Sequence, residues 1–412
     1  MDGVAGTHPL RDQRRAASET ALLDAAWAQF ARAGPDGVSL RDVARDAGCT
    51  HTLLGRYFGS KDGLVTAVSD RLTLAVATTV DAAWASADPL VGLLSAARDD
   101  RSCVRLLVRC GLGDLRPAGF PECLGADRLL SRTLDYSGPG DGHPGRRSRL
   151  LAYSASSLLL GWLTFEEFLV AALRLGRVSA RRLDPAVAAA AERIMSLAGS
   201  TDPSLSLRDV RGGRTVPRLP SEPSTSSKDR LLASAIILFA QRGPASVSVR
   251  DIGRHAGVNQ GLIYRHFGSK EALLAEAIQE GASGLFPAAL AADGFDFDLM
   301  SHLLHHSSPA PRLLARTIVD GIQITAVRQQ FPVLRRLLDT SDHGPTGTGP
   351  VVGSDPRLAV VSVGALALGS VIWGGLLRNT LGLSDRDGIE AAVADLARFL
   401  LAGPMVPLRQ GD

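Results

Sequence analysis

Lysine is almost missing from this sequence, although basic residues are not. Of 45 basic residues only Lys61, Lys228 and Lys270 are lysines, so arginine carries nearly all of the positive charge. A GC-rich genome would suppress lysine and leave a few remnants. However, Lys61 and Lys270 occupy the same Gly-Ser-Lys turn in two copies of a repeat. This placement favours a functional role for these two side chains.

Other scarcities limit the class of protein. The chain has four cysteines and no CxxC pair, which argues against a disulfide framework or a zinc site and favours reduced thiols in the cytoplasm. The first 15 residues lack the apolar core of a secretory signal. Aromatic residues make up 5%, and leucine and alanine dominate over β-branched runs, which predicts an all-α protein. No nucleophile elbow, phosphate-binding Walker loop or zinc-hydrolase motif occurs, so we predict neither an enzyme nor a cofactor.

One apolar stretch has roughly the length of a membrane span. Residues 358–377 are uncharged, but glycine, alanine and serine are frequent among them. The corresponding stretch in the first half, 158–173, carries Glu166 and Glu167 near its middle. We therefore expect both stretches to be buried or interface helices, with no membrane partner.

What the sequence does contain is a long internal repeat. Residues 30–64 and 239–273 align without a gap at an offset of 209, and about half of the positions are identical. The flanking helical stretches repeat more faintly, with Gly161 aligned to Gly369. A unit of about 200 residues is therefore duplicated, which predicts two copies of one working part.

The composition along the chain suggests six segments. We expect a basic N-terminal arm (1–15), a first motif domain (16–66), a first helical domain (67–199), a linker rich in Ser, Pro and Gly (200–227), a second motif domain (228–275) and a second helical domain (276–412). At 412 residues each of these domains has room for its own core.

The repeated motif predicts a helix-turn-helix. In the second copy, Ser248 is placed to cap a short helix that ends at Gly257. A tight turn with a capping Asn259 then leads into a helix over 260–267. Ile263 and Phe267 are four residues apart and face inward, which leaves the other side chains of this helix for DNA.

The segment VSVRDIGRHAGVNQGLIYRHFGSKEALL, residues 247–274, resembles the TetR family of transcriptional regulators. This resemblance implies a fold of two tandem units, each a three-helix DNA-binding domain followed by a helical bundle. It further implies that the bundle dimerises and often binds an apolar effector. The implied partner is double-stranded DNA, and the implied location is the cytoplasm.

The first copy departs from the pattern. Gly55 stands where Tyr264 stands, and Thr52 replaces Gly261. A helical glycine is unfavourable by roughly 0.5–1 kcal/mol relative to alanine. Two interpretations stay open: a different half-site preference, or a decayed reader that is kept for its fold.

From the motif we predict the DNA contacts of both copies. In the first copy they are Ser39, Arg41, Thr50, His51, Thr52, Arg56, Tyr57 and Lys61. In the second they are Ser248, Arg250, Asn259, Gln260, Gly261, Tyr264, Arg265, His266 and Lys270. The lysines and Tyr264 are assigned to phosphates, whereas Asn259 and Gln260 are assigned to bases.

Signals for a small-molecule pocket are weaker. Candidates for its lining are Trp162, Glu166, Gln323, Trp373 and Arg378, although the tryptophans also suit a core. Three histidines, His302, His305 and His306, have helical spacing but no cysteine or carboxylate close by in the sequence. We therefore expect an exposed helix end there and no metal site.

Together these patterns predict a ligand-responsive repressor. Because both units lie in one chain, we expect them to pair as an intramolecular pseudo-dimer through the helices around Gly161 and Gly369, and to read an asymmetric operator. An ordinary homodimer of two chains is the rival arrangement. The alternative function is a small-molecule sensor with weak or no DNA recognition of its own, acting through protein partners.

Overall fold

The computed structural model describes residues 9–115, 125–137, 144–173, 175, 180–200, 207, 226–283, 290–291, 294–322, 334, 337–338, 356–384 and 387–402. These residues are helical apart from connecting turns and one two-residue antiparallel pair, so the all-α prediction is confirmed.

The first unit begins with three helices and continues into a bundle. Its elements are α1 (Pro9–Ala33), α2 (Leu40–Asp46), α3 (His51–Phe58), α4 (Lys61–Trp84), α5 (Pro89–Asp99), α6 (Arg101–Gly111), α8 (Ala126–Ser137), α9 (Arg146–Ala172), α10 (Ala180–Ser196) and the 3-10 turn η1 (Leu197–Gly199).

The second unit again has a three-helix domain followed by a bundle, and it also contains a short strand pair. Its elements are α11 (Ser227–Arg242), α12 (Val249–Ala256), α13 (Gly261–Phe267), α14 (Lys270–Ser283), β1 (Leu290–Ala291), β2 (Gly294–Phe295), α16 (Phe297–His306), α17 (Ala310–Val319), α19 (Pro356–Thr380) and α20 (Ile389–Ala402).

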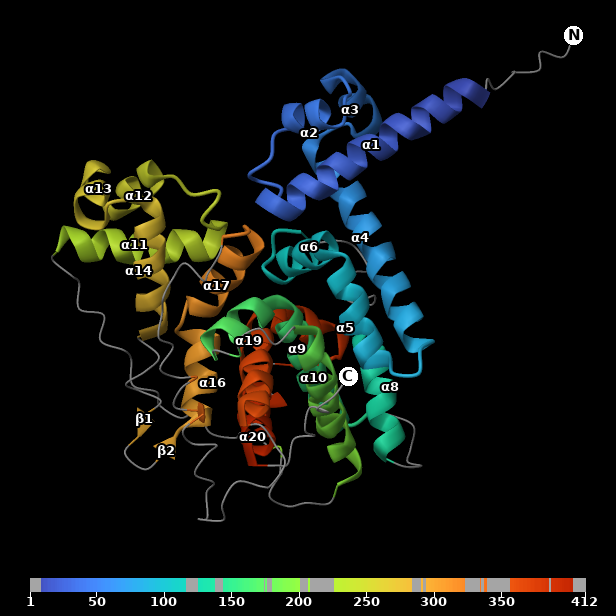
Figure 1. The fold of residues 1–412 in the computed structure, drawn as a ribbon, viewed down its shortest axis with the longest axis vertical. Coiled ribbons are helices and arrows are strands. Elements are labelled where there is room, and N and C mark those ends of the chain that lie inside the picture. Colours follow the sequence, from blue (N-terminus) through green and yellow to red (C-terminus); the bar gives the residue numbers. More distant parts are fainter. Residues whose placement is uncertain are drawn as a thin grey trace, which may run out of the picture.

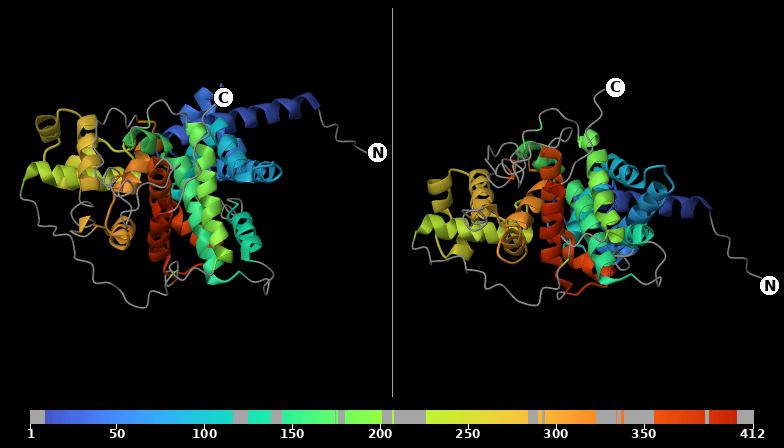
Figure 2. Two further views of the ribbon diagram at one scale, coloured as in Figure 1. Left: turned by 60° about the horizontal axis from the view of Figure 1, so that its bottom comes forward. Right: turned by 90° about the horizontal axis from the view of Figure 1, so that it is seen from below.

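The two three-helix domains lie on the same side of the molecule, at opposite ends (Figure 1). Helices α1–α3 form one domain and α11–α13 the other, and α4 and α14 lead from them toward the bundle. The two views in Figure 2 keep the domains apart, with α9 and α19 between them. Both three-helix domains are thus presented by a single chain.

Helices α9 and α19 form the centre of the bundle and pack closely against each other. Two glycines allow this close approach. A Cβ atom built at Gly161 would lie 1.9 Å from the carbonyl oxygen of Ala365, and one at Gly369 would lie 2.0 Å from that of Ser157. The predicted pairing of the helices around Gly161 and Gly369 is therefore present within one chain.

The hydrophobic cores differ between the two units. One large core runs from the first three-helix domain through α9 into α19 and α20, so the two units share it. The second three-helix domain has a smaller core of its own, built around Phe239, Ile252 and Ile263, which reaches α17 through Leu313. The two bundles therefore form a single packed body.

Some expected boundaries differ from the structure. Helix α1 begins at Pro9, so the segment expected as a basic arm, 1–15, partly belongs to the first helix. The recognition helix of the second unit begins at Gly261 instead of residue 260. Apart from Ser200, Leu207, Ser226 and Ser227, the expected linker (200–227) lies outside the described residues.

Three described helices have the length and apolar composition of a membrane span, namely α4, α9 and α19. The apolar windows of α9 and α19 are 78% and 72% buried inside the protein. Their apolar surface is thus used in packing, which explains why the stretch 358–377 lacks charge.

The crossing of α9 and α19 gives a first prediction. Gly161→Ala should destabilise the protein by about 1–3 kcal/mol, because the added methyl group meets backbone and the helices must separate. The control Gly375→Ala lies on the exposed side of α19 with no atom within 4 Å of the new methyl group, and should be neutral or stabilising by up to about 1 kcal/mol. Denaturant unfolding measures both, and equal effects would contradict the role of the crossing.

Candidate nucleic-acid interface

The helix-turn-helix of the second unit is held by local capping. Ser248 Oγ accepts a hydrogen bond from the backbone N–H of Asp251, and the Asp251 carboxylate accepts one from that of Ser248. The hydrogen bond to Ser248 holds the pKa of Asp251 below its usual range. Gly257 ends α12 with a φ of 64°, a left-handed conformation that glycine adopts without strain. The predicted caps Ser248 and Gly257 are confirmed, whereas the N-cap of α13 is Gln260 and not the expected Asn259.

The recognition helix α13 buries one side and exposes the other. Ile263 and Phe267 are in the core, whereas Gln260, Gly261, Tyr264, Arg265 and His266 are exposed. Tyr264 is unusual among large side chains because 57% of its surface is accessible. Asn259 Oδ1 accepts a hydrogen bond from the N–H of Gly261, 2.8 Å away. This oxygen therefore already stabilises the start of α13.

The first unit reproduces the scaffold with different exposed residues. Thr50 Oγ1 accepts from the N–H of Leu53, and Leu54 is fully buried. His51, Thr52 and Arg56 are exposed, whereas Tyr57 is half-buried beside Phe58. Gly55 is exposed, with open space where a side chain would lie. The fold of the reader is thus intact, and its outer face lacks the bulky hydroxyl side chain of the second copy.

The turns after both recognition helices place a lysine at a helix start. Ser60 Oγ caps α4 by accepting from Gly63 N–H, and Ser269 Oγ caps α14 by accepting from Ala272 N–H. Lys61 and Lys270 are the first residues of these helices, where backbone N–H groups favour an anion. Burial lowers the pKa of Lys270, and the charges of Glu271 and Asp320 oppose this shift. The ammonium group of Lys270 is therefore partly buried, which a side chain assigned to a DNA phosphate need not be.

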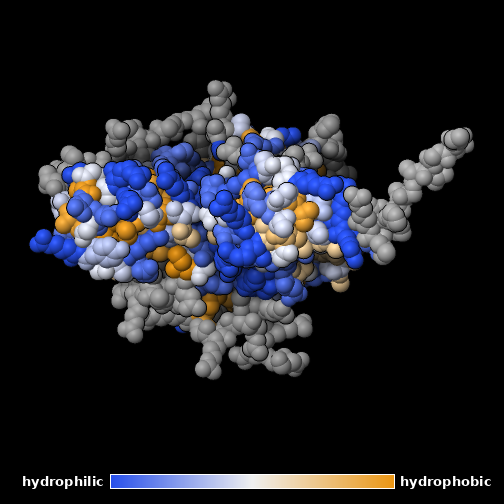
Figure 3. All heavy atoms as spheres, turned by 90° about the horizontal axis from the view of Figure 1, so that it is seen from above, coloured by the Kyte–Doolittle hydropathy of each residue, from blue (hydrophilic) through white to orange (hydrophobic). Residues whose placement is uncertain are grey.

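The remaining predicted DNA contacts, Ser39, Arg41, Ser248 and Arg250, are exposed at the starts of α2 and α12. The face that carries both domains is turned to the viewer in Figure 3, where hydrophilic residues dominate and apolar residues form smaller patches. All predicted contacts thus lie in the two three-helix domains or at the first residues of α4 and α14.

A largely buried network of four charges joins the two units, and the sequence did not predict it. Arg109 on α6 donates to the carboxylate of Asp320 at 3.0 Å and lies 3.4 Å from that of Asp114. Arg316 on α17 makes two hydrogen bonds to Asp114, at 2.7 and 2.9 Å. Each arginine therefore binds an aspartate of the other unit, and two positive charges balance two negative ones.

The same arginines bind the ends of the first helices of their own units. Arg109 donates to the carbonyl oxygen of Arg32 at 3.1 Å, at the end of α1, and Arg316 donates to that of Ala240 at 2.9 Å, near the end of α11. Asp320 also accepts from the N–H of Ala245, just beyond α11. The network thus links both DNA-binding domains to each other. Its sequence signal is the repeated Leu-Leu-x-Arg of residues 106–109 and 313–316.

The residues predicted to line a ligand pocket are not among those that line the apolar cavity of this protein. Trp162 is buried and donates to Asp184, and Glu166 is buried in ion pairs with Arg98 and Arg101. Trp373 is buried and donates to Thr164. Arg378 donates to a carbonyl of its own helix, and Gln323 lies outside the described residues. The described members of this set thus make polar contacts inside the protein, and none of them lines the apolar cavity described next.

This apolar cavity lies in the second unit and is lined by other residues. It measures about 130 Å³ and lies between α16, α17, α19 and α20. Its lining includes Met300, Leu304, Ala367, Val393 and Ala394, and the walls are almost wholly apolar. Ile278 contributes from α14, the helix that follows the recognition helix and its turn. No periodicity signal marks such a cavity, because its walls come from six of the described helices, including α9 of the first unit, and from β2.

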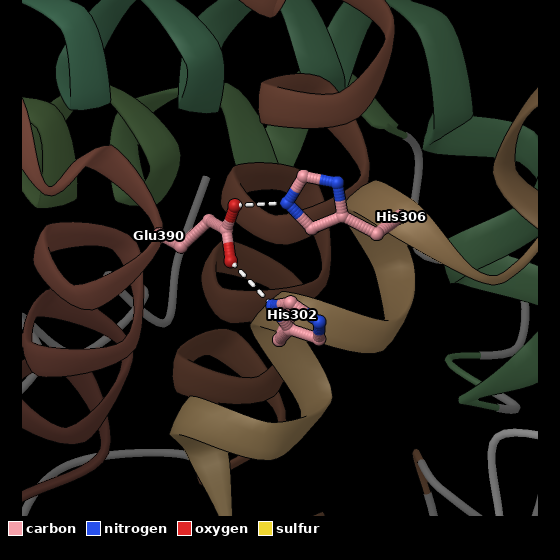
Figure 4. Close-up of side chains that lie close together, drawn as sticks. All are labelled: His302, His306 and Glu390. Carbon is pink, nitrogen blue, oxygen red and sulfur yellow. Dashed lines mark hydrogen bonds and ion pairs between the residues drawn. The ribbon is translucent and has the colours of Figure 1, made fainter. Parts of the chain in front are cut away.

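The histidines of α16 also differ from expectation. His302 and His306 face Glu390 on α20, which is distant in sequence and close in space (Figure 4). Helix α16 ends at His306, which is exposed as expected, but a carboxylate that is distant in sequence lies beside it. His305 points the other way and bonds to Ser301 and Ser370.

Two helix-turn-helix domains on one face of a helical protein define a DNA-binding transcriptional regulator. Residues 22–68 and 231–277 each match the family described as bacterial regulatory proteins, tetR family. The chain is 33% identical to the HTH-type transcriptional repressor Rv3405c of Mycobacterium tuberculosis (strain ATCC 25618 / H37Rv) over 172 residues, which cover 39% of this chain and 80% of that protein. It belongs to the TetR family of bacterial transcriptional regulators.

Two further relatives support this assignment. The HTH-type transcriptional repressor KstR2 of Mycolicibacterium smegmatis is 41% identical over 70 residues, 17% of this chain and 34% of that protein. The uncharacterized HTH-type transcriptional regulator Rv1255c of M. tuberculosis is 29% identical over 181 residues, 44% of this chain and 76% of that protein. The longer matches show that less than half of this chain corresponds to most of a relative, as a tandem duplication requires.

The charge network gives a second prediction. Asp320→Asn keeps the shape of the side chain but leaves the buried Arg109 without this counter-charge, so it should destabilise the protein by about 3–5 kcal/mol. The control Asp81→Asn removes an exposed partner of Arg128 and should cost no more than about 1 kcal/mol. Chemical unfolding compares them. A cost for Asp320→Asn no greater than that of the control would refute a coupling role.

Proposed function

We propose that this regulator is a repressor that reads an asymmetric operator as a single-chain pseudo-dimer. One observation carries the proposal: the two units share a core and exchange arginine–aspartate contacts within one chain. Such a chain already holds the two readers that ordinary members of the family assemble from two subunits. Repression is inferred from two relatives that are themselves called repressors. The site of action is the bacterial cytoplasm.

The unlike recognition helices support an asymmetric site. The first offers His51, Thr52 and an open space at Gly55, whereas the second offers Gln260 and Tyr264. Since base edges are read by the exposed side chains of these helices, two different sets favour two different half-sites. The second half-site should be the more stringent, because the first copy departs from the family pattern at Gly55 and Thr52.

The domain organisation proposed from the sequence fits this function. We retain the two DNA-binding domains at 16–66 and 228–275, the regulatory domains at 67–199 and 276–412, and the linker at 200–227. A flexible linker of about 28 residues spans on the order of 30 Å. Covalent linkage raises the effective concentration of the partner surface and favours pairing within the chain.

An experiment on the whole protein tests the pseudo-dimer. Light scattering at micromolar concentration should give the mass of one chain, and selection of bound DNA at fixed salt should yield an uneven site with half-sites about one DNA turn apart. A two-chain particle on a perfect palindrome would sink the proposal.

Substitutions in the two recognition helices and in the lysine turns test individual DNA contacts in the same experiment. Gln260→Ala should reduce discrimination in one half-site by about 1–3 kcal/mol, whereas Thr52→Ala should affect only the other. Lys61→Ala and Lys270→Ala should weaken binding to all sequences alike and reduce the salt slope by about one unit each. Lys61 is the cleaner test of the two, because burial lowers the pKa of Lys270. A changed sequence preference in Lys61→Ala would contradict a phosphate contact.

We further propose that the cavity of the second unit binds a small apolar effector. Its walls are apolar, and Ile278 lies on the helix that leaves the second DNA-binding domain. A ligand that displaces Ile278 would move α14 and with it the reader. Release from DNA requires that the effector prefer the DNA-incompetent state, since equal affinity for both states shifts nothing.

Thermal-shift measurements with a panel of lipophilic compounds test this cavity. A compound that stabilises the wild type should lose its effect in Ala367→Leu, which fills the cavity, but not in Ala75→Leu on α4. If compounds stabilise all three proteins equally, the cavity is not their site.

The alternative is a sensor that acts through protein partners. The exposed Gly55 in the first recognition helix favours this view for the first reader. The salt dependence of DNA binding decides between the two functions, because phosphate contacts release counterions and affinity then falls steeply as salt rises.

A further inference from the structure

His302, His306 and Glu390 form a cluster between α16 and α20 (Figure 4). The histidines are one helical turn apart, and their rings lie 4.7 Å from each other. His302 Nδ1 is 3.1 Å from one oxygen of Glu390, and His306 Nε2 is 2.5 Å from the other. All three side chains are partly exposed, so a solute reaches them from solvent.

We propose that these three residues bind a divalent transition-metal ion, with Zn²⁺ as the best match. Two imidazole nitrogens and one carboxylate oxygen are ligands that Zn²⁺ and its neighbours in the series prefer. Three protein ligands leave one position of a tetrahedral site for water or an exogenous ligand.

The spacing of the ligand atoms fits such an ion. With bonds of about 2.0 Å, two ligands of a tetrahedral zinc lie about 3.3 Å apart. The ligand atoms of the cluster lie within 4.8 Å of one another, and the two nitrogen–oxygen distances to Glu390 are 3.1 and 2.5 Å. The widest separation therefore exceeds this spacing by at most about 1.5 Å, which rotation of the side chains can close without movement of the helices.

The surroundings hold the two helices in place for an ion. Ser301 Oγ donates to the backbone oxygen of Glu390 at 3.0 Å, and Arg398 on α20 pairs with Asp298 on α16. His305, which shares the helix, bonds to Ser301 and Ser370 and so faces away from the cluster. Two of the three histidines of α16 therefore face Glu390, whereas the third has other partners.

A bound ion would join α16 to α20. Ser301 on α16 and Val393 on α20, each within three residues of a ligand, line the apolar cavity. The ion would therefore fix one wall of this cavity. This last consequence rests on the proposed effector function, whereas metal binding itself does not.

Titration of the EDTA-treated full-length protein with Co²⁺ tests the site. We expect one equivalent per chain and the intense visible absorption of four-coordinate cobalt, which Zn²⁺ should then abolish because it binds such sites more tightly. Zn²⁺ should also slow hydrogen exchange in α16 and in the first turn of α20.

Substitutions test which side chains bind the ion. His306→Ala and Glu390→Gln should each weaken Co²⁺ binding at least about 100-fold, more than the loss of an outer-layer partner costs. Glu390→Gln keeps the size of the side chain and one acceptor oxygen, so it remains informative if His306→Ala fails to fold. His305→Gln and Glu167→Gln, which remove a histidine from the same helix and an exposed carboxylate from α9, should keep full affinity.

Unchanged Co²⁺ affinity in Glu390→Gln, or no saturable binding by the wild type, would overturn the metal site. The cluster would then be a hydrogen-bonded pair of histidines around one carboxylate. The DNA-selection experiment has a different readout, so failure of the metal site and failure of the proposed function are separable.

Discussion

The close contact between α9 and α19 is the constraint on which the rest of the protein depends. At Gly161 and Gly369 the two backbones approach so closely that even a methyl group would meet a carbonyl oxygen. This contact buries two long apolar helices that would otherwise expose membrane-like surface. It also brings the two regulatory bundles into one body, from which both DNA-binding domains extend on the same side (Figure 1).

The charge network fixes how the two DNA-binding domains are arranged on the packed bundle. Arg109 and Asp320 are each 2% exposed, so their desolvation is unfavourable and only close pairing compensates for it. Because each arginine also holds the end of α1 or α11, a shift of one DNA-binding domain disturbs partners of the other. Because a buried ion pair is by itself weak evidence for stability, we expect this network to act mainly on the arrangement of the two DNA-binding domains.

Duplication has left the two units alike in scaffold and unlike in detail. Caps, glycine turns and lysine turns recur in both DNA-binding domains. By contrast, the apolar cavity and the cluster of His302, His306 and Glu390 belong to the second unit, and the first unit buries Glu166 in ion pairs instead. In a single chain the two halves are free to diverge, since no symmetry forces one sequence to serve both roles.

The sequence by itself determined the local and repeated features. Caps such as Ser248 and Thr50, the inward Ile263 and Leu54, the duplication and the family all depend on residues close together in the chain, where spacing alone dictates the outcome. The sequence did not reveal the charge network, the cavity or the carboxylate that faces the histidines of α16. These depend on residues 80 to more than 200 positions apart, such as Arg109 with Asp320 and His306 with Glu390. Such pairs meet only after the helices pack, because burial and distance between distant segments are properties of the tertiary structure.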